Sequence, residues 1–188
     1  MSWSTLKRRT PLKSNGCGLR RTPFKRKPVA WSSAAVEKKA VSARKTGNTA
    51  KKASKADLVE RLDRVFSLYI RLRDAMDGGR CVCISCGRQF PFEQMQCGHY
   101  IRRAVMATRF DPLNCWGQCP ECNCHKAGNL TEYRRNLVQK IGAENFEELL
   151  ALSRTTRKWG ESELKDAIRF YTKEAKRLSA EKGIHVNI

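Results

Sequence analysis

The strongest constraint on the fold is a pair of Cys-x2-Cys motifs. Cys83 and Cys86 form the first motif, Cys119 and Cys122 form the second, and thirty-two residues lie between them. Two cysteines separated by two residues can bind the same ion, and two such pairs supply the four thiolates of a tetrahedral zinc site. We therefore predict a structural Zn²⁺ on these four cysteines, with an element of separate purpose inserted between the pairs.

The assignment of individual thiols is open, because nine cysteines are present in total. No apolar core or cleavage site of a secretory signal follows the basic N-terminus, so we expect a reducing compartment, where clustered thiols bind metal more often than they form disulfides. The remaining candidates in the same region compete for the ion: Cys81, Cys97, Cys115, Cys124 and His125. The two Cys-x2-Cys pairs are favoured because each forms a self-contained knuckle.

Positive charge is concentrated at one end of the chain. The protein has 188 residues and a formal net charge of +20. Residues 1–55 hold sixteen Lys or Arg and one acidic residue, whereas residues 56–188 hold twenty-two basic and seventeen acidic residues. The first segment is also poor in apolar residues, which predicts a disordered or extended basic arm that binds a polyanion. No apolar run reaches the roughly 18–20 residues of a membrane span, so no membrane partner is expected.

The arm contains a short repeat, "RRTPLK" and "RRTPFK", twelve residues apart. We predict that its arginine pairs, Arg8 with Arg9 and Arg20 with Arg21, contact nucleic-acid phosphates. The alternative is a solvated basic tail without a defined role.

Residues 56–188 are predicted to form a mainly α domain around an irregular centre at 80–130. Apolar spacing predicts a helix that begins at Asp57 as its N-cap and ends at Gly78–Gly79. Three further helices are predicted over 129–142, 143–153 and 161–183.

The inserted element holds the candidate catalytic and metal-binding residues. It reads "CGHYIRR" and then "RFDPLN", and Asn123 directly follows Cys122. This layout resembles the HNH endonucleases. The longer string "CISCG…CGHYIRR…RFD..N…QC..CN…GN" resembles, more narrowly, the NinG (Rap) family of lambdoid phages, which are recombination endonucleases. The resemblance implies a zinc-braced ββα-metal centre of the His-Me finger type, and a structure-specific enzyme that hydrolyses phosphodiesters in D-loops and Holliday junctions.

The resemblance also implies residue roles. His99 would be the general base. Asn114 would hold the loop and orient His99. Asn123 would bind a catalytic Mg²⁺ or Mn²⁺, as would Asp111, because Gly98 offers no side chain where many HNH enzymes have a metal ligand. Arg102, Arg103 and Arg109 are further candidates for phosphate contacts.

Each of these residues has a plainer interpretation. His99 is also a candidate zinc ligand in a Cys97-x-His99 pair, or a packed histidine. Asn114 and Asp111 suit turns next to Pro112, and Asn123 suits the start of a helix. The arginines suit an ordinary charged surface.

Two functions therefore stay open. The first is the DNA endonuclease, which would act in the cytoplasm of a bacterial host. Recombination proteins are its candidate partners. Paired cuts across a junction use two active sites, so a homodimer is a candidate assembly. The second is a zinc-stabilised nucleic-acid-binding module without catalysis, which leaves the spacing of His99, Asn114 and Asn123 unexplained.

Overall fold

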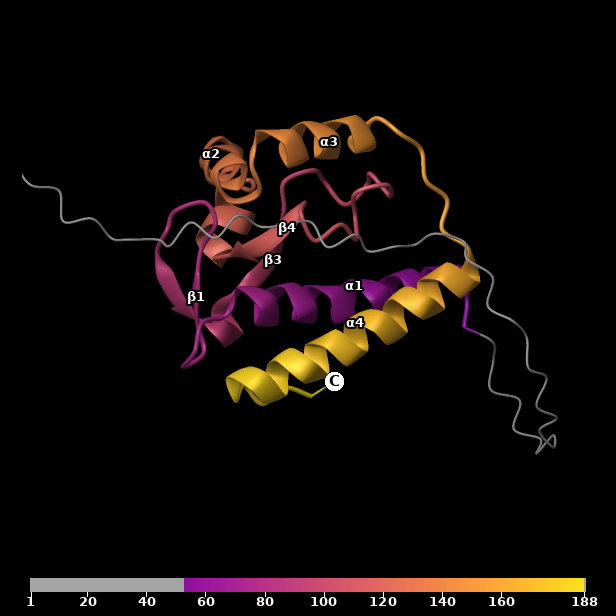
Figure 1. Ribbon diagram of the computed structural model, residues 1–188, viewed down its shortest axis with the longest axis horizontal. Coiled ribbons are helices and arrows are strands. Elements are labelled where there is room, and N and C mark those ends of the chain that lie inside the picture. Colours follow the sequence, from indigo (N-terminus) through magenta and orange to yellow (C-terminus); the bar gives the residue numbers. More distant parts are fainter. Residues whose placement is uncertain (1–52, 188) are drawn as a thin grey trace, which may run out of the picture.

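A computed structural model of the protein describes residues 53–187. Figure 1 shows two long helices, α1 and α4, lying side by side along one side of the domain. The strands β3 and β4 lie between this pair and the two shorter helices, α2 and α3. The elements follow one another in the order α1 (Lys55–Asp74), β1 (Arg80–Val82), β2 (Gln89–Pro91), the 3-10 turn η1 (Phe92–Gln94), β3 (Gln96–His99), β4 (Cys115–Gln118), the π-helical turn η2 (Glu121–His125), α2 (Leu130–Ile141), α3 (Ala143–Ser153) and α4 (Glu161–Lys182).

The boundaries of α1 differ from those predicted at both ends. Ser54 is the N-cap, and Asp57 stands three residues inside: the Ser54 hydroxyl accepts from the Asp57 N–H at 3.2 Å, and the Asp57 carboxylate accepts from the Ser54 N–H at 2.8 Å. This reciprocal capping box explains why an acidic residue here marks the first turn and not the cap itself. The helix ends at Asp74, and Gly78 and Gly79, both at positive φ, form the turn into β1.

The main core lies between α1 and α4. Phe66 of α1 contacts Tyr171 of α4 edge to face, with ring centroids 4.9 Å apart. Lys182, at the end of α4, donates to the carbonyl oxygens of Leu72 at 2.8 Å and Arg73 at 3.1 Å, and to that of Ala75. A cation at a helix C-terminus satisfies free carbonyls and complements the helix dipole, so Lys182 fixes the end of α1 from which β1 departs.

Two antiparallel hairpins make up the irregular centre. β1 pairs with β2, and β3 pairs with β4 in the register that places Gln96 opposite Gln118 and His99 opposite Cys115. The prediction of a mainly α domain with a small irregular centre is confirmed, and the three later helices match their predicted ranges closely.

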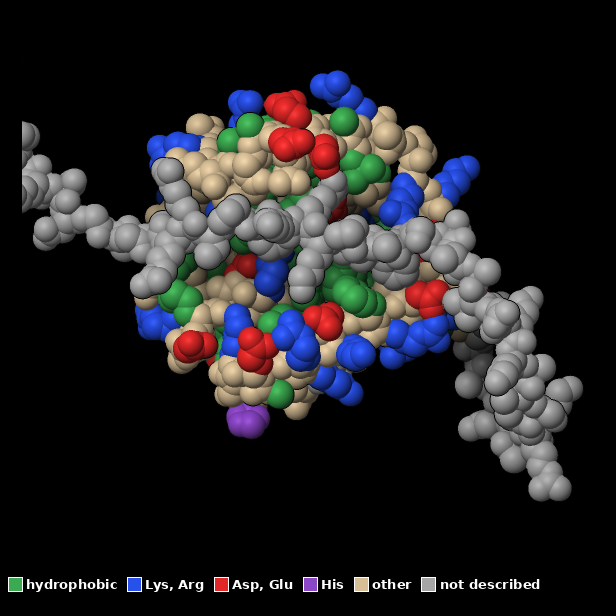
Figure 2. Space-filling view, in the orientation of Figure 1, with side chains coloured by type: hydrophobic (Ala, Val, Ile, Leu, Met, Phe, Trp, Pro, Cys, Tyr) green, Lys and Arg blue, Asp and Glu red, His purple; other side chains and the backbone are tan. Residues whose placement is uncertain are grey.

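Ion pairs join charged side chains of opposite sign on the surface of the described part of the chain. Figure 2 shows Lys and Arg side chains next to Asp and Glu along α4. Arg177, for example, pairs with both Glu174 and Glu181.

No helix within residues 53–187 has the length and apolarity that crossing a membrane requires. The predicted arm lies outside the described residues except at its last positions, and Arg8, Arg9, Arg20 and Arg21 lie outside them entirely.

Candidate metal centre and histidine pocket

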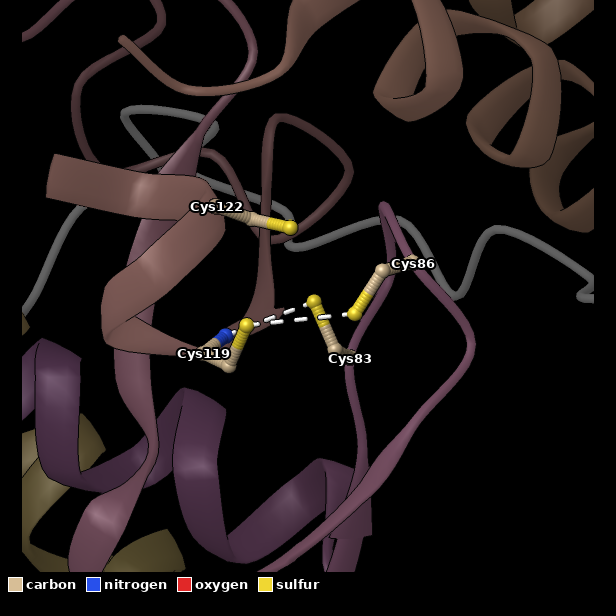
Figure 3. A group of neighbouring side chains, drawn as sticks. All are labelled: Cys83, Cys86, Cys119 and Cys122. Carbon is tan, nitrogen blue, oxygen red and sulfur yellow. Dashed lines mark hydrogen bonds between the residues drawn. The ribbon is translucent and has the colours of Figure 1, made fainter. Parts of the chain in front are cut away.

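Four cysteine side chains converge next to the two hairpins. Cys83 and Cys86 come from the loop between β1 and β2, while Cys119 follows β4 and Cys122 lies in η2. Their sulfur atoms point toward one another (Figure 3) and all lie within 4.8 Å of each other. Cys83, Cys119 and Cys122 are fully buried.

This arrangement fits a tetrahedral Zn²⁺ site. Four sulfurs at Zn–S distances of about 2.3 Å are separated from one another by about 3.8 Å. The Sγ atoms of Cys86 and Cys119 are 3.9 Å apart, close to that value. The four thiols predicted as ligands are therefore brought together by the fold, and they suit a soft, four-coordinate ion.

Hydrogen-bond donors surround the sulfurs. The backbone N–H of Cys119 donates to Cys83 Sγ at 3.4 Å, and Asn129 Nδ2 donates to Cys122 Sγ at 3.6 Å. Burial opposes ionisation of Cys86, but hydrogen bonds from Arg88 outweigh it and lower the pKa of this thiol to about 6, whereas burial raises the pKa of Cys83 to about 12. Donors aimed at sulfur stabilise thiolates, which is the form that binds metal.

The backbone of the first knuckle is held from two sides. Gly87, at φ +70°, donates its N–H to the Cys83 carbonyl at 2.9 Å and closes the turn. Asn136 of α2 donates to the carbonyl oxygens of Ile84 at 2.7 Å and Ser85 at 3.2 Å. The knuckle is thereby fixed to the helical layer.

The competing thiols are placed elsewhere. Cys81 is buried with its Sγ 3.9 Å from the Arg71 carbonyl, and Cys124 and His125 are exposed. Cys97 and Cys115 instead form a second close group with His99, in which the ligand atoms also lie within 4.8 Å of one another. All eight cysteines of the described region are free thiols.

His99 faces a surface pocket of about 410 Å³. It is the last residue of β3 and is half-buried. Arg102, Arg103 and Asn123 also line this pocket, and both arginines are exposed. Four of the predicted site residues are thus gathered around one opening.

The ring of His99 is oriented by a backbone carbonyl. His99 Nε2 lies 3.1 Å from the carbonyl oxygen of Arg109. Because a carbonyl only accepts, the proton resides on Nε2 and the lone pair on Nδ1. Burial, followed by the positive charge of Arg103, lowers the pKa of His99 below its ordinary value of 6.5, so the ring is neutral at pH 7.

Asn114 is fully buried and braces the loop that precedes it. Its Oδ1 accepts from the Ile101 N–H at 2.7 Å, and its Nδ2 donates to the carbonyl oxygens of Ile101 at 2.9 Å and Thr108 at 3.0 Å. Thr108 is next to Arg109, whose carbonyl orients His99. Asn114 therefore acts on His99 through the loop and does not itself line the pocket.

Asn123 lines the pocket from η2. Its Nδ2 donates to Gln96 Oε1 at 2.6 Å, which leaves the carboxamide oxygen as its ligand atom. Its backbone N–H donates to the Cys119 carbonyl at 2.9 Å. η2 begins at Glu121 without a side-chain cap, so the interpretation of Asn123 as a helix-start residue is wrong, and its side chain is directed to Gln96 at the pocket.

Two sequence predictions are not supported by their positions. Arg109 forms a bidentate pair with Asp63 of α1, at 3.0 and 2.5 Å, so its charge is neutralised within the domain and is not offered to a phosphate. Asp111 is absent from the pocket lining, and its Oδ1 accepts from the Leu113 N–H at 2.9 Å, the pattern of a turn residue before Pro112.

Gln118 was not singled out by sequence, yet it connects the two knuckles. It is fully buried and donates to Ser85 Oγ at 2.7 Å and to the Gly128 carbonyl at 2.6 Å. A Cβ atom on Gly98 would come within 2.3 Å of Gln118 Oε1, so this position excludes any side chain. The glycine before His99 is therefore a packing requirement, and the signal available in the sequence was a glutamine within an otherwise apolar strand.

Comparison with known proteins places the chain in a phage family. A model of the family described as "Bacteriophage Lambda NinG protein" matches residues 16–181. Proteins named ninG from Escherichia phage 933W and Escherichia phage lambda are 37% and 36% identical to the chain over 92 residues, and that from Salmonella phage P22 is also 36% identical. Each match covers 48% of this chain and 43% of the relative, so it spans less than half of the relative's length. No solved structure matches significantly. Because the family model covers most of the chain, the chain belongs to the NinG family of bacteriophage lambda.

Proposed function

We propose that the chain is a divalent-metal-dependent endonuclease that hydrolyses phosphodiester bonds in branched DNA, such as D-loops and Holliday junctions. The observation that supports this most is the His99 pocket, where a neutral imidazole of fixed tautomer lies with two exposed arginines and Asn123. The branched substrate and the role in phage recombination come from the family resemblance.

The local topology suits an HNH centre. β3 and β4 supply two antiparallel strands, and η2 supplies a helical turn after them. His99 ends the first strand and Asn123 lies on the helical turn, so a base and a metal ligand approach the same pocket from two elements.

Each residue of the pocket has a separate role in the proposed reaction. The lone pair of His99 takes a proton from water, and the hydroxide formed attacks the phosphorus while the bond to the 3′ oxygen breaks. Arg102 and Arg103 hold the phosphate by charge-assisted hydrogen bonds. Asn114 keeps the loop in place, so that the Arg109 carbonyl continues to orient the base.

The catalytic ion would be a hard one. When bound, Mg²⁺ or Mn²⁺ stabilises negative charge on the phosphate and on the departing oxygen. No carboxylate lines the pocket among the described residues, so Asn123 would hold the ion together with water and phosphate oxygens, ligands that suit Mg²⁺.

Incubation of the purified chain with a four-way junction, a D-loop and a linear duplex of matched sequence tests this proposal. We expect cutting of the branched substrates with Mg²⁺ or Mn²⁺, none with EDTA, and little cutting of the duplex. Cutting of all three substrates equally would remove the structure-specific part. Binding of junctions without cutting under any divalent ion would support the alternative, a zinc-stabilised DNA-binding module.

A further inference from the structure

The second cysteine group occupies one face of the β3–β4 hairpin. Cys97 and His99 are two residues apart on β3 and therefore point to the same face. The register places Cys115 directly opposite His99, so its side chain shares that face, and Gly117 stands opposite Cys97. Three ligand-bearing side chains are thus assembled by strand pairing alone.

These side chains converge closely enough to share an ion. Their ligand atoms lie within 4.8 Å of one another, the same limit that the four-cysteine cluster meets. The Arg109 carbonyl lies 3.1 Å from His99 Nε2 and 3.8 Å from Cys115 Sγ, so the ring and the thiol are neighbours, and Nδ1 is the ring atom left to bind an ion. A ring N–H held by a backbone carbonyl is also the usual support of a metal-binding histidine.

The Cys97–His99–Cys115 group differs from the four-cysteine cluster in the number of its ligands and in its access to solvent. It offers two thiols and one imidazole, a set that suits Zn²⁺ or Cd²⁺ and leaves a fourth position for water. Cys115 is fully buried, but Cys97 and His99 both line the His99 pocket, through which an ion would reach them. Two thiol protons would pass to solvent on binding, and the resulting thiolates would balance the charge of the ion.

We propose that Cys97, His99 and Cys115 form a second, exchangeable site for a thiophilic divalent ion, and that an ion in this site withdraws His99 from its role as general base. The binding of the ion stands on the geometry alone. The inhibition rests on the proposed function, because only an active nuclease can be inhibited through its base.

Cd²⁺ titration of the reduced 188-residue chain, followed by the thiolate-to-metal absorption and by metal content per chain, tests the site. We expect two equivalents in the wild type, the second bound more weakly and removed by a mild chelator. The variants Cys97→Ser and Cys115→Ser should each retain the first equivalent and weaken the second by at least about tenfold. Cys124→Ser, which alters an exposed cysteine outside both groups, should retain both equivalents.

Retention of the first equivalent and of the helical circular dichroism spectrum shows that a variant is folded. His99→Ala removes the third ligand at the pocket edge without altering a core thiol, so it should weaken the second equivalent even if the cysteine variants fail to fold. A single equivalent in the wild type, or a second one that persists in His99→Ala at full affinity, would overturn the site.

Cleavage assays then separate this inference from the proposed function. With Mg²⁺ present, added Zn²⁺ or Cd²⁺ should inhibit cutting over the range in which the second equivalent binds, and the mild chelator should restore it. A second ion in a chain that cuts nothing would uphold the site and refute the nuclease. Cutting by a chain that binds no second ion would support the nuclease and refute the second metal site.

Discussion

The four-cysteine cluster and the His99 pocket both border the β3–β4 hairpin but are built differently. Cys83, Cys86, Cys119 and Cys122 surround their site with four soft ligands and leave no position open. The His99 group has three ligands and faces a surface pocket lined by two exposed arginines. A closed ligand set suits a structural ion, whereas an incomplete set beside an opening suits chemistry. We therefore propose that the first site stabilises the fold and that the second carries the chemistry.

Substitution of Cys119 should give the largest effect. Cys119→Ser removes a fully buried ligand and, with it, the structural ion, so we expect the free energy of unfolding to fall by about 5 kcal/mol or more. Urea denaturation and zinc content of the purified chain measure this. Cys97→Ser should cost only about 1–2 kcal/mol, as expected for one buried thiol changed to a hydroxyl. Equal losses in the two variants would contradict the division between the sites.

Asn114 and Asn136 offer a matched pair, because each holds one of the two sites in place. Asn114→Ala leaves three backbone groups of Ile101 and Thr108 without their side-chain partner and should cost about 3 kcal/mol, with at least about tenfold slower cutting through displacement of the Arg109 carbonyl. Asn136→Ala affects the cysteine knuckle and should weaken zinc retention while cutting by the zinc-loaded fraction is unchanged. The comparison fails if the two variants change zinc retention and cutting in the same proportion.

The exposed arginines of the pocket should contribute to DNA binding. Arg102→Gln and Arg103→Gln are each expected to weaken junction binding by about three- to tenfold and to reduce the salt dependence by about one ion per contact. Arg169→Gln is the control, since Arg169 is exposed on α4 but pairs with Asp166. Binding isotherms at several salt concentrations decide the matter, and an effect of Arg169→Gln equal to the others would show a diffuse charge effect.

The pH dependence of cutting should reflect a neutral base. Protonation removes the lone pair of His99, and burial together with Arg103 holds the pKa of this ring below 6.5. Cutting with Mg²⁺ should therefore be constant near pH 7 and decline only below pH 6.5, by about tenfold per unit once the ring is protonated. A decline that begins well above pH 6.5, with junction binding unchanged, would exclude His99 as the titrating base.

The helices were predictable because apolar spacing and capping are local properties. The 161–183 prediction agrees with α4 because its apolar face and Gly183 both lie within the segment. The four-cysteine cluster was predictable for a similar reason, since each Cys-x2-Cys pair carries its own geometry.

The other features of the site depended on contacts between residues that are distant in the sequence. Arg109 was predicted to contact phosphate, but its partner, Asp63, lies 46 positions earlier on α1. The grouping of Cys115 with His99 requires the register of β3 and β4, which no local pattern gives. The alternation of Cys97 and His99 did indicate a shared face, and this was the available signal for the proposed second site.

The single-turnover cutting rate of His99→Ala on a saturating four-way junction with Mg²⁺ tests the central claim most directly. Zinc content and junction affinity are measured on the same preparation. The division between the sites predicts a rate at least about a hundredfold below wild type, with one zinc ion retained and affinity changed by less than about threefold. A rate close to that of the wild type, or loss of the structural zinc together with activity, would contradict it.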